Sequence, residues 1–504
     1  MVGEQEMKRK LMILFMTIFF VCVYGVPVFA ESSQLDDEIF YEIIVDRFNN
    51  GNYEIDYNID VEDPAAYHGG DLEGITKKLD DLVELGVTTL ALSPIMANSD
   101  AGFHGYWIED FKEIDEQFGT FEDLDVLVTE AHNRDIKVIL EFVTNHVSEI
   151  HPLVVDPEKS DWVDSESLEG LEWADHAVKL NQDNPEVRGF LIDAASFWLE
   201  ETSIDGLVLH GVDQSSLEFL EVFTRELKDR HEDFYLLGDI LNSETENVTE
   251  ILERTSLDAI DNYELGNLIS EVFSEPDQAV SQIYEASATA TEYPSIVGVD
   301  DKYSMRFTQK FAENKRNTLT AWKLALTYMY TTPGVPVILQ GSEVGMYGDS
   351  AEDSQRLVPF GSGEPELKEF HDRISSLRNQ LPPLRHGDFE LVDSADSMTV
   401  FKRSYDGQTA YIAINNGSES SYIDVSGIES DKMMRGYLED NIVRINEEGN
   451  FRIGIPRESI EVYEVLDDVG INWLFISFVI GVMVTFVLGI IVLSIRSKKD
   501  EAKG

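Results

Sequence analysis

The chain has 504 residues, 43% of them hydrophobic, which is enough for one large core and a smaller second one. Asp and Glu total 96 against 38 Lys and Arg, so the formal net charge is -58. Such a surface repels nucleic acid, and we expect no nucleic-acid partner. A solvated acidic exterior is favoured over an acidic tail with a specific partner. Cys22 is the single cysteine of the sequence, which excludes an intramolecular disulfide.

The first residues have the layout of a secretory signal peptide. Basic residues at positions 8–10 precede an apolar run from Leu11 to Tyr24, and Ala30 ends a small-residue cleavage motif. Residues 1–30 are therefore predicted to be removed on export, with an uncleaved anchor as the alternative.

The last residues predict a membrane anchor. Residues 473–495 are free of charge, mostly apolar and long enough to cross a bilayer, and three basic residues follow within 496–499. The positive-inside rule places residues 496–504 in the cytoplasm. We expect a single-pass protein of the cell membrane, attached through this C-terminal helix, with its ectodomain extracellular.

Between these ends, short apolar runs alternate with amphipathic ones, as parallel strands joined by helices do. Eight strands are predicted, and eight is the number that closes a TIM (β/α)8 barrel. The predicted strands are Ile39 to Val45, Thr88 to Leu92, Lys137 to Phe142, Gly206 to His210, Phe234 to Ile240, Ala259 to Tyr263, Ser295 to Val299 and Pro336 to Gln340. From about residue 381 to 467, apolar and polar residues alternate between turn signals, which is typical of antiparallel strands.

Several segments, in chain order, resemble the α-amylase family of glycoside hydrolases (glycoside hydrolase family 13). Examples are FYEIIVDRFNNGN at 40–52, the long segment from His104 to His146, DGLVLHGVDQ at 205–214 and TTPGVPVILQGSEVGM at 331–346. The resemblance implies an α/β fold: a TIM (β/α)8 barrel over 31–380 and an antiparallel β-sandwich over 381–467. It also implies a short inserted domain after strand 3, at about 147–180.

The family's three catalytic carboxylate positions are all altered. By the resemblance, His210 stands at the nucleophile position, Asp239 at the general-acid position and Tyr303 at the position of the third carboxylate. Val208 replaces the arginine beside the nucleophile, and Lys302 replaces a histidine. Since catalytic groups that act as a unit lose most of their effect together, a degenerate, non-hydrolysing member is predicted. The alternative is an active α-glucan hydrolase or transglycosidase that uses altered residues.

Part of the family's sugar-binding wall is retained. By the resemblance, His104, Tyr106 and His146 match family residues that stack on or hydrogen-bond the sugar. Trp107 adds an aromatic face, and Asp300 is the remaining aspartate of the family's seventh-strand motif, so both are also expected to bind substrate. Aromatic faces offer the apolar surface that a sugar ring packs on, so residual α-glucan binding is expected. The alternative is that these side chains only line the barrel mouth. The expected partner is an α-glucan or a membrane or envelope protein.

Of the family's two calcium sites, one is predicted to be lost and the other to be kept. At the central site Asn145 remains, but Lys179 stands where an aspartate would bind, so this calcium is predicted to be lost. In the first loop, oxygen ligands of the kind that calcium takes remain, and calcium is favoured there over a metal-free polar loop. These are Asn50, Asn52, Asp56, Gly69 and Asp71.

One further cluster is not part of the family pattern. His104, His146 and His210 are expected to project into the barrel mouth near Asp239. Three imidazoles with a carboxylate are ligands of a zinc-like site, while simple hydrogen bonding among them is the alternative.

Overall fold

The computed structural model describes residues 34–164, 176–231, 233–241, 248–287, 293–468 and 470, together with the helical backbone of 473–501. The predicted signal peptide lies outside these described residues.

Within the described residues, eight parallel strands close a barrel, in the order β1-β12-β11-β10-β9-β8-β5-β2. They are β1 (Phe40–Ile43), β2 (Thr89–Leu92), β5 (Lys137–Val143), β8 (Gly206–His210), β9 (Tyr235–Gly238), β10 (Ala259–Asp261), β11 (Ser295–Gly298) and β12 (Val335–Leu339). The predicted strands are confirmed, and their ends differ by at most two residues. Most of their residues are apolar and buried, as in a parallel strand covered by helices, although β1, β5 and β10 each carry an acidic residue.

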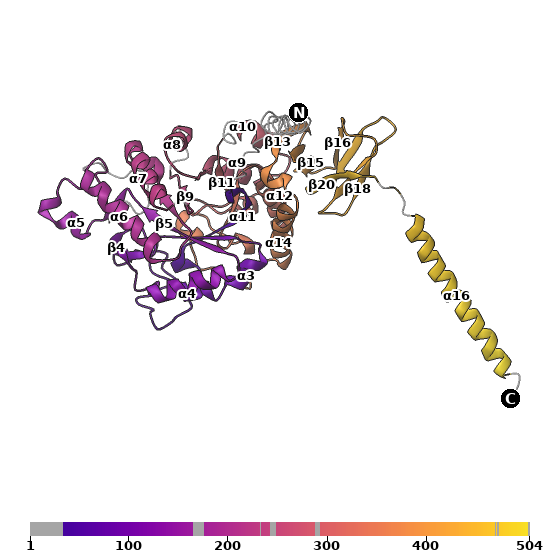
Figure 1. The fold of residues 1–504 in the computed structure, drawn as a ribbon, viewed down its shortest axis with the longest axis horizontal. Helices are drawn as coiled ribbons and strands as arrows, with labels where there is room; N and C mark the ends of the chain where they lie inside the picture. Colours follow the sequence, from indigo (N-terminus) through magenta and orange to yellow (C-terminus); the bar gives the residue numbers. More distant parts are fainter. Residues whose placement is uncertain are drawn as a thin grey trace, which may run out of the picture.

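Helices surround the barrel, and local sequence signals start them. Thr120 and Asp123 form a capping box at the start of α4, and Asn184 followed by Pro185 starts α6. The main covering helices are α2 (Leu72–Thr76), α3 (Leu79–Glu84), α4 (Phe121–His132), α6 (Pro185–Glu201), α7 (Leu217–Arg230), α8 (Val248–Arg254), α9 (Tyr263–Ser274), α10 (Ser281–Ser287), α11 (Phe307–Glu313), α12 (Thr318–Thr331) and α14 (Pro365–Gln380). Figure 1 shows helices such as α4, α6 and α7 around the barrel strands.

Short elements fill the loops. Antiparallel pairs form between β3 (Met96–Asn98) and β4 (Ile108–Ile114), and between β6 (His146–Ser148) and β7 (Ala177–Lys179). The second pair brackets the region after the third barrel strand where a short insertion is predicted. The remaining short helices are η1 (Gln34–Asp37), η2 (Val45–Arg47), α5 (Pro152–Val155), η3 (Pro157–Lys159), η5 (Val212–Gln214), η6 (Ser342–Val344), α13 (Ala351–Ser354) and α15 (Pro383–His386).

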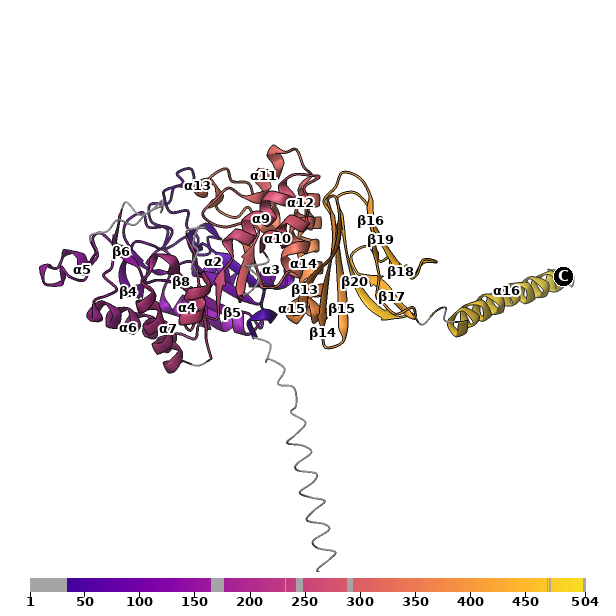
Figure 2. The same ribbon diagram turned by 90° about the horizontal axis from the view of Figure 1, so that it is seen from above.

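The C-terminal domain consists of two antiparallel sheets with an apolar core between them (Figure 2). In the described residues one sheet has the order β13-β14-β15-β20-β17-β18, and the other pairs β16 with β19. The strands are β13 (Asp388–Ala395), β14 (Met398–Tyr405), β15 (Gln408–Asn415), β16 (Ser421–Val425), β17 (Lys432–Gly436), β18 (Ile442–Arg444), β19 (Phe451–Ile455) and β20 (Ser459–Asp467). This confirms the predicted antiparallel C-terminal domain.

An aromatic contact joins this domain to the barrel. Tyr328 of α12 lies edge-on to Phe401 of β14, with ring centroids 5.5 Å apart, and Phe389 of β13 stacks on Phe401 at 5.0 Å. Buried aromatic rings make large apolar contacts, so the two domains share one continuous interface.

The C-terminal helix α16 (Trp473–Glu501) extends away from both domains (Figures 1 and 2). Its described apolar side chains, including Phe478, Phe486 and Ile491, are exposed. Among the described residues, no helix combines the length and the apolarity that crossing a membrane requires. The predicted transmembrane helix is therefore not confirmed.

Candidate active site

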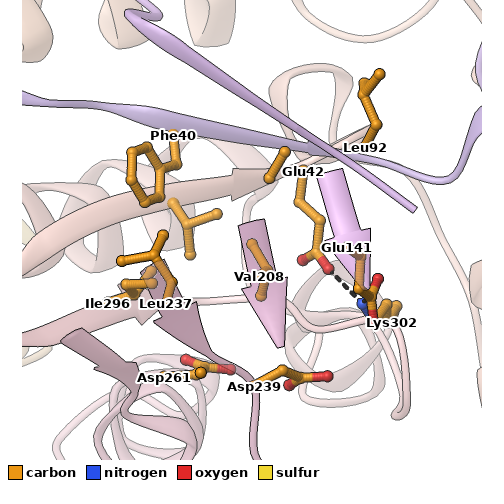
Figure 3. A pocket seen from close by; sticks show the side chains of 13 residues that line it. Phe40, Glu42, Leu92, Glu141, Val208, Leu237, Asp239, Asp261, Ile296 and Lys302 are labelled. Atoms are coloured by element: carbon orange, nitrogen blue, oxygen red, sulfur yellow. Dashed lines mark hydrogen bonds and ion pairs between the residues drawn. The ribbon is translucent and has the colours of Figure 1, made fainter. Parts of the chain in front are cut away.

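The altered family positions lie at the carboxyl ends of the barrel strands, next to a small cavity of about 60 Å³ in the barrel interior. Figure 3 shows the side chains that line this cavity. Active sites of such barrels lie at this end. Apolar side chains line part of the cavity, but charged ones line the rest, which is unusual for a barrel core. The charged lining consists of Glu42, Glu141, Asp239, Asp261 and Lys302.

His210 occupies the last position of β8 and lies wholly inside the protein. Its Nδ1 is 2.7 Å from an oxygen of Glu141 and 3.3 Å from an oxygen of Asp239. Gly211 then turns the chain in a left-handed conformation, with φ of 58°, and a Cβ there would lie 2.9 Å from the Asn145 amide nitrogen. A glycine is required for this turn, which fixes where the imidazole points.

Asp239 and Tyr303 form a direct pair. The Tyr303 hydroxyl donates to Oδ2 of Asp239 at 2.6 Å, and the same oxygen faces His210. The three family catalytic positions are therefore in contact, although two of them carry no carboxylate.

Lys302 supplies a positive charge inside the barrel mouth. Its ammonium lies 2.8 Å from Glu42 of β1 and 2.8 Å from Glu141 of β5 (Figure 3). The Tyr106 hydroxyl also donates to Glu141, at 3.0 Å. At the family's arginine position Val208 adds only apolar surface to the cavity. Lys302 thus pairs with a buried carboxylate next to that position.

The pKa values in this cluster argue against Asp239 acting as the general acid. Burial opposes the charged form of Asp239, but Lys302, His210 and Tyr303 outweigh it and lower its pKa to about 2. Burial likewise opposes a charged His210, yet hydrogen bonds to Asp239 and Glu141 raise its pKa above the ordinary value. A glycosidase acid needs a raised pKa to hold its proton at neutral pH. Asp239 is ionised instead.

A carboxyl group with a raised pKa, that of Asp261, lies on the neighbouring strand. Burial, together with the charges of Asp239 and Glu42, raises the pKa of Asp261 well above its usual range. Asp261 belongs to β10 and lines the same small cavity. The residues that line this cavity do not include His104, Tyr106 or Trp107 of the predicted sugar-binding wall.

The predicted sugar-binding wall is assembled and largely buried. The rings of His104 and Tyr106 stack at 5.4 Å, Trp107 lies edge-on to His104 at 4.6 Å, and the Tyr106 ring lies 4.4 Å from His210. His146 contacts Asn145 through Nδ1 at 2.7 Å. Within this wall, Trp107 retains partial exposure, while His104, Tyr106 and His146 are buried.

Asp300 has a structural role in the described contacts. One oxygen accepts from the backbone N–H of Phe307 at 2.6 Å, and the other from the Ser342 hydroxyl at 2.7 Å. The Arg306 guanidinium lies 3.6 Å away. The carboxylate therefore secures the start of α11, and its predicted role in sugar binding stays a prediction.

The first-loop residues divide into two groups. Asn50 donates its side-chain amide to both oxygens of Asp56 at 3.1 Å, and a Cβ at Gly69 would lie 2.5 Å from that amide nitrogen. The side-chain oxygen of Asn50 is buried without a hydrogen-bond partner among the described residues. Asn50, Asp56 and Gly69 could supply oxygen ligands to a cation such as calcium. The buried side-chain oxygen of Asn50, which has no partner among the described residues, favours a bound cation there.

Asp71 does not fit that site. Its carboxylate accepts the backbone N–H groups of Gly74 at 2.6 Å, Gly51 at 2.9 Å and Asn52 at 2.7 Å. Backbone donors already surround both oxygens, so Asp71 acts as the N-cap of α2 and stabilises the loop. Asn52 contributes its backbone N–H here, and its side-chain oxygen accepts from Glu54.

At the family's central calcium position, Asn145 directs its amide nitrogen toward the carbonyls of His210 and Gly211, at 3.4 and 3.3 Å. Lys179 lies in β7, paired in register with His146 of β6.

The His146 and His210 rings lie 5.8 Å apart, but among the described residues His104, His146 and His210 do not reach metal-ligand spacing together. In the described part of the chain, the side chains that converge to metal-ligand spacing are Glu141, His210 and Asp239, with all ligand atoms within 4.8 Å of one another. Strand register explains this: Glu141 of β5 is aligned with Val208 of β8, two residues before His210 on the same face, so the Glu141 carboxylate reaches the imidazole. His104 and His146 instead pack against aromatic rings and Asn145.

The sequence interpretation did not identify Glu42 and Glu141 as site residues. A signal was present, because each is an acidic residue with apolar neighbours on both sides in a largely buried strand. A charge in such a run is almost never buried without a partner, which is a reason to search for one. Lys302 is that partner.

An eight-stranded parallel barrel whose mouth holds three altered carboxylate positions defines an α-amylase-type glycosidase scaffold. The sequence matches the family "Alpha amylase, catalytic domain" over residues 42–169 and 159–376, and "Alpha-amylase C-terminal domain" over 387–463. The chain belongs to the α-amylase family.

Named relatives and solved structures agree with this. A cyclomaltodextrinase of a Bacillus species is 29% identical over 432 residues, covering 78% of this chain and 75% of the relative. An α-amylase structure from Anoxybacillus is 39% identical with a TM-score of 0.82, and covers 87% of this chain and 99% of that one. An α-amylase structure from Geobacillus thermoleovorans, complexed with acarbose, is 37% identical with a TM-score of 0.80, over 86% and 99% of the two chains.

Proposed function

We propose that this protein binds α-glucans at the mouth of its barrel without hydrolysing them. Support for α-glucans comes from the family and from the aromatic wall of His104, Tyr106 and Trp107. Support for the absence of hydrolysis comes from one observation: His210, which cannot form a glycosyl ester, fills the nucleophile position and is held between Glu141 and Asp239.

The second candidate is hydrolysis by altered residues, and the relatives favour it, since those named above are α-amylases and a cyclomaltodextrinase. In this protein Tyr303 donates to ionised Asp239, and a tyrosine paired with a carboxylate serves as nucleophile in some glycosidases. The side chains of this site nevertheless favour binding without hydrolysis. A retaining glycosidase needs both a nucleophile and a protonated acid, and the low pKa of Asp239 removes the acid.

One experiment separates the two candidates. The purified full-length protein is incubated with maltooligosaccharides and with cyclomaltodextrins, and both sugar release and binding are measured. We expect binding without sugar release above a buffer blank. Release that disappears in both Tyr303→Phe and Asp239→Ala would establish hydrolysis and overturn the proposal. Trp107→Ala is expected to weaken binding, because its partly exposed ring offers the sugar a packing surface.

We further propose that calcium stabilises the first loop through Asn50, Asp56 and the carbonyl of Gly69. The buried, unpartnered side-chain oxygen of Asn50 supports this, and Asp71 is omitted because backbone N–H groups already surround it. A cation there joins two parts of one loop and needs no role in chemistry.

For location, we propose export through the N-terminal segment and attachment to the outer face of the cell membrane through α16. The apolar run of the sequence and the exposed apolar side chains of Phe478, Phe486 and Ile491 support attachment. An envelope protein bound near the membrane remains the proposed alternative partner.

A further inference from the structure

Glu141, His210 and Asp239 present ligand atoms to one point at the barrel mouth. A carboxylate oxygen of each acid and a ring nitrogen of His210 all lie within 4.8 Å of one another. We propose that these residues form a binding site for a divalent transition metal of the zinc class.

The geometry is close to that of a tetrahedral site. Zinc bonds of about 2.0–2.2 Å place neighbouring ligand atoms about 3.3–3.6 Å apart. The separation between His210 Nδ1 and Asp239 Oδ2 is 3.3 Å. The separation between the same nitrogen and Glu141 Oε1 is 2.7 Å, so Glu141 has to move back by about 0.6 Å, which rotation of its side chain provides.

Three adjacent barrel strands hold the ligands in place. Glu141 lies within β5, His210 ends β8, and Asp239 directly follows β9. These strands are paired in a fixed parallel register, in which Val143 faces His210 and Leu209 faces Gly238. Ligands on barrel strands are positioned more rigidly than ligands on loops, so the loss of entropy on metal binding is small.

Hydrogen bonds from neighbouring side chains orient the carboxylates of Asp239 and Glu141. The hydroxyl of Tyr303 donates to Asp239 Oδ2 at 2.6 Å, and that of Tyr106 to Glu141 Oε1 at 3.0 Å. Lys302 binds the other Glu141 oxygen, Oε2, at 2.8 Å, which leaves Oε1 directed at His210. Hydrogen bonds of this kind to ligating carboxylates are typical of metal sites and raise affinity.

The charge balance also favours a cation. The Lys302 ammonium pairs with both Glu42 and Glu141, and Asp239 lies beside His210, so three carboxylates face one lysine and one imidazole. A divalent ion takes the place of a proton on His210 Nδ1 and so adds one positive charge to this buried excess of carboxylates, where unbalanced charge is costly. One imidazole with two carboxylates suits zinc and its first-row neighbours better than calcium, which takes oxygen ligands.

The site is tested by titrating the purified, metal-free full-length protein with Co²⁺ and Zn²⁺. We expect one equivalent of Co²⁺ to produce a visible absorption band that Zn²⁺ abolishes and excess Ca²⁺ does not. Tyr303→Phe should weaken binding by about 10- to 100-fold, as loss of an orienting contact does, and His210→Gln or Asp239→Asn by more than that.

Control variants separate this site from the acidic surface. His176→Gln removes an exposed histidine that pairs with Glu149, and it should leave binding unchanged. Circular dichroism verifies that each variant folds. If a ligand variant does not fold, Glu141→Gln is titrated in its place. Absence of the cobalt band in the wild type overturns the proposal. Binding that survives His210→Gln and Asp239→Asn unchanged also overturns it, because the ions then lie on the surface. Glucan binding is measured separately and does not decide this result.

Discussion

Lys302 has an unusual position for a lysine, because its ammonium is buried between Glu42 and Glu141. Removing one member of a buried ion pair leaves an uncompensated charge, which costs about 3–5 kcal/mol. We therefore expect Lys302→Met to lower the free energy of unfolding by about that amount in a denaturant titration.

Two comparisons check this expectation. Lys402→Met removes a surface partner of Glu390 and should change stability by no more than about 1 kcal/mol. Adding Glu141→Gln to Lys302→Met removes one of the unpaired charges and should restore part of the loss. Equal effects of Lys302→Met and Lys402→Met would contradict the structural role of Lys302.

Buried histidines make the protein sensitive to acid. Burial lowers the pKa of His146 and His371 to about 3 each, and that of His151 to about 4, from the ordinary 6.5. Below about pH 6.5 the unfolded chain takes up these protons and the folded protein does not, so stability falls as the pH falls. Each such proton contributes a slope of up to about 1.4 kcal/mol per pH unit.

His210 has the opposite shift, because its pKa is raised in the folded protein. Its stabilising contribution is complete below the unfolded pKa and is lost as the pH rises through the folded pKa. It therefore adds no slope between about pH 4 and 6.5. Denaturant titrations across that range should show the free energy of unfolding falling with pH. His371→Leu should reduce the slope of this fall by the contribution of about one proton. An unchanged slope in His371→Leu would show that this histidine is not buried in its neutral form.

At the level of secondary structure, we expect the first loop and α2 to respond differently to calcium. We expect millimolar calcium to raise the melting temperature, since a ligand of the folded state stabilises it by mass action. Asp56→Ala should abolish the rise. Asp71→Ala should lower stability by about 1 kcal/mol through loss of the α2 cap, but keep the rise. Identical melting curves of the wild type in calcium and in chelator would count against the site.

The barrel strands were predictable because each is an apolar run long enough to be buried on both faces. The short pairs β3–β4 and β6–β7 were not, since three-residue strands such as Met96–Asn98 carry no periodic signal. For the site, the sequence identified the positions of His210, Asp239 and Tyr303. It did not identify Glu141 as their neighbour, because strand register decides which side chains meet across a barrel.

At the scale of the whole molecule, the proposed attachment through α16 has a direct test. With the ectodomain outside, protease added to intact, wall-stripped cells should remove the barrel and the C-terminal domain. A tag placed after Gly504 should survive inside the cell. Digestion of the tag with protection of the barrel, or release of the protein into the medium, would contradict attachment in this orientation.

Closure of the barrel sets a condition on how the chain folds. β1 pairs with both β2 and β12, so the first and last barrel strands, Phe40–Ile43 and Val335–Leu339, are neighbours. Arg378 then binds the carbonyls of Asp36 and Gly334, next to both strands, at 3.2 and 2.9 Å. Contacts so distant in sequence form slowly, because loop-closure entropy is lost before they form. During synthesis β1 therefore has an unpaired edge until nearly the whole barrel has emerged, and a chaperone that covers this edge should raise the folding yield.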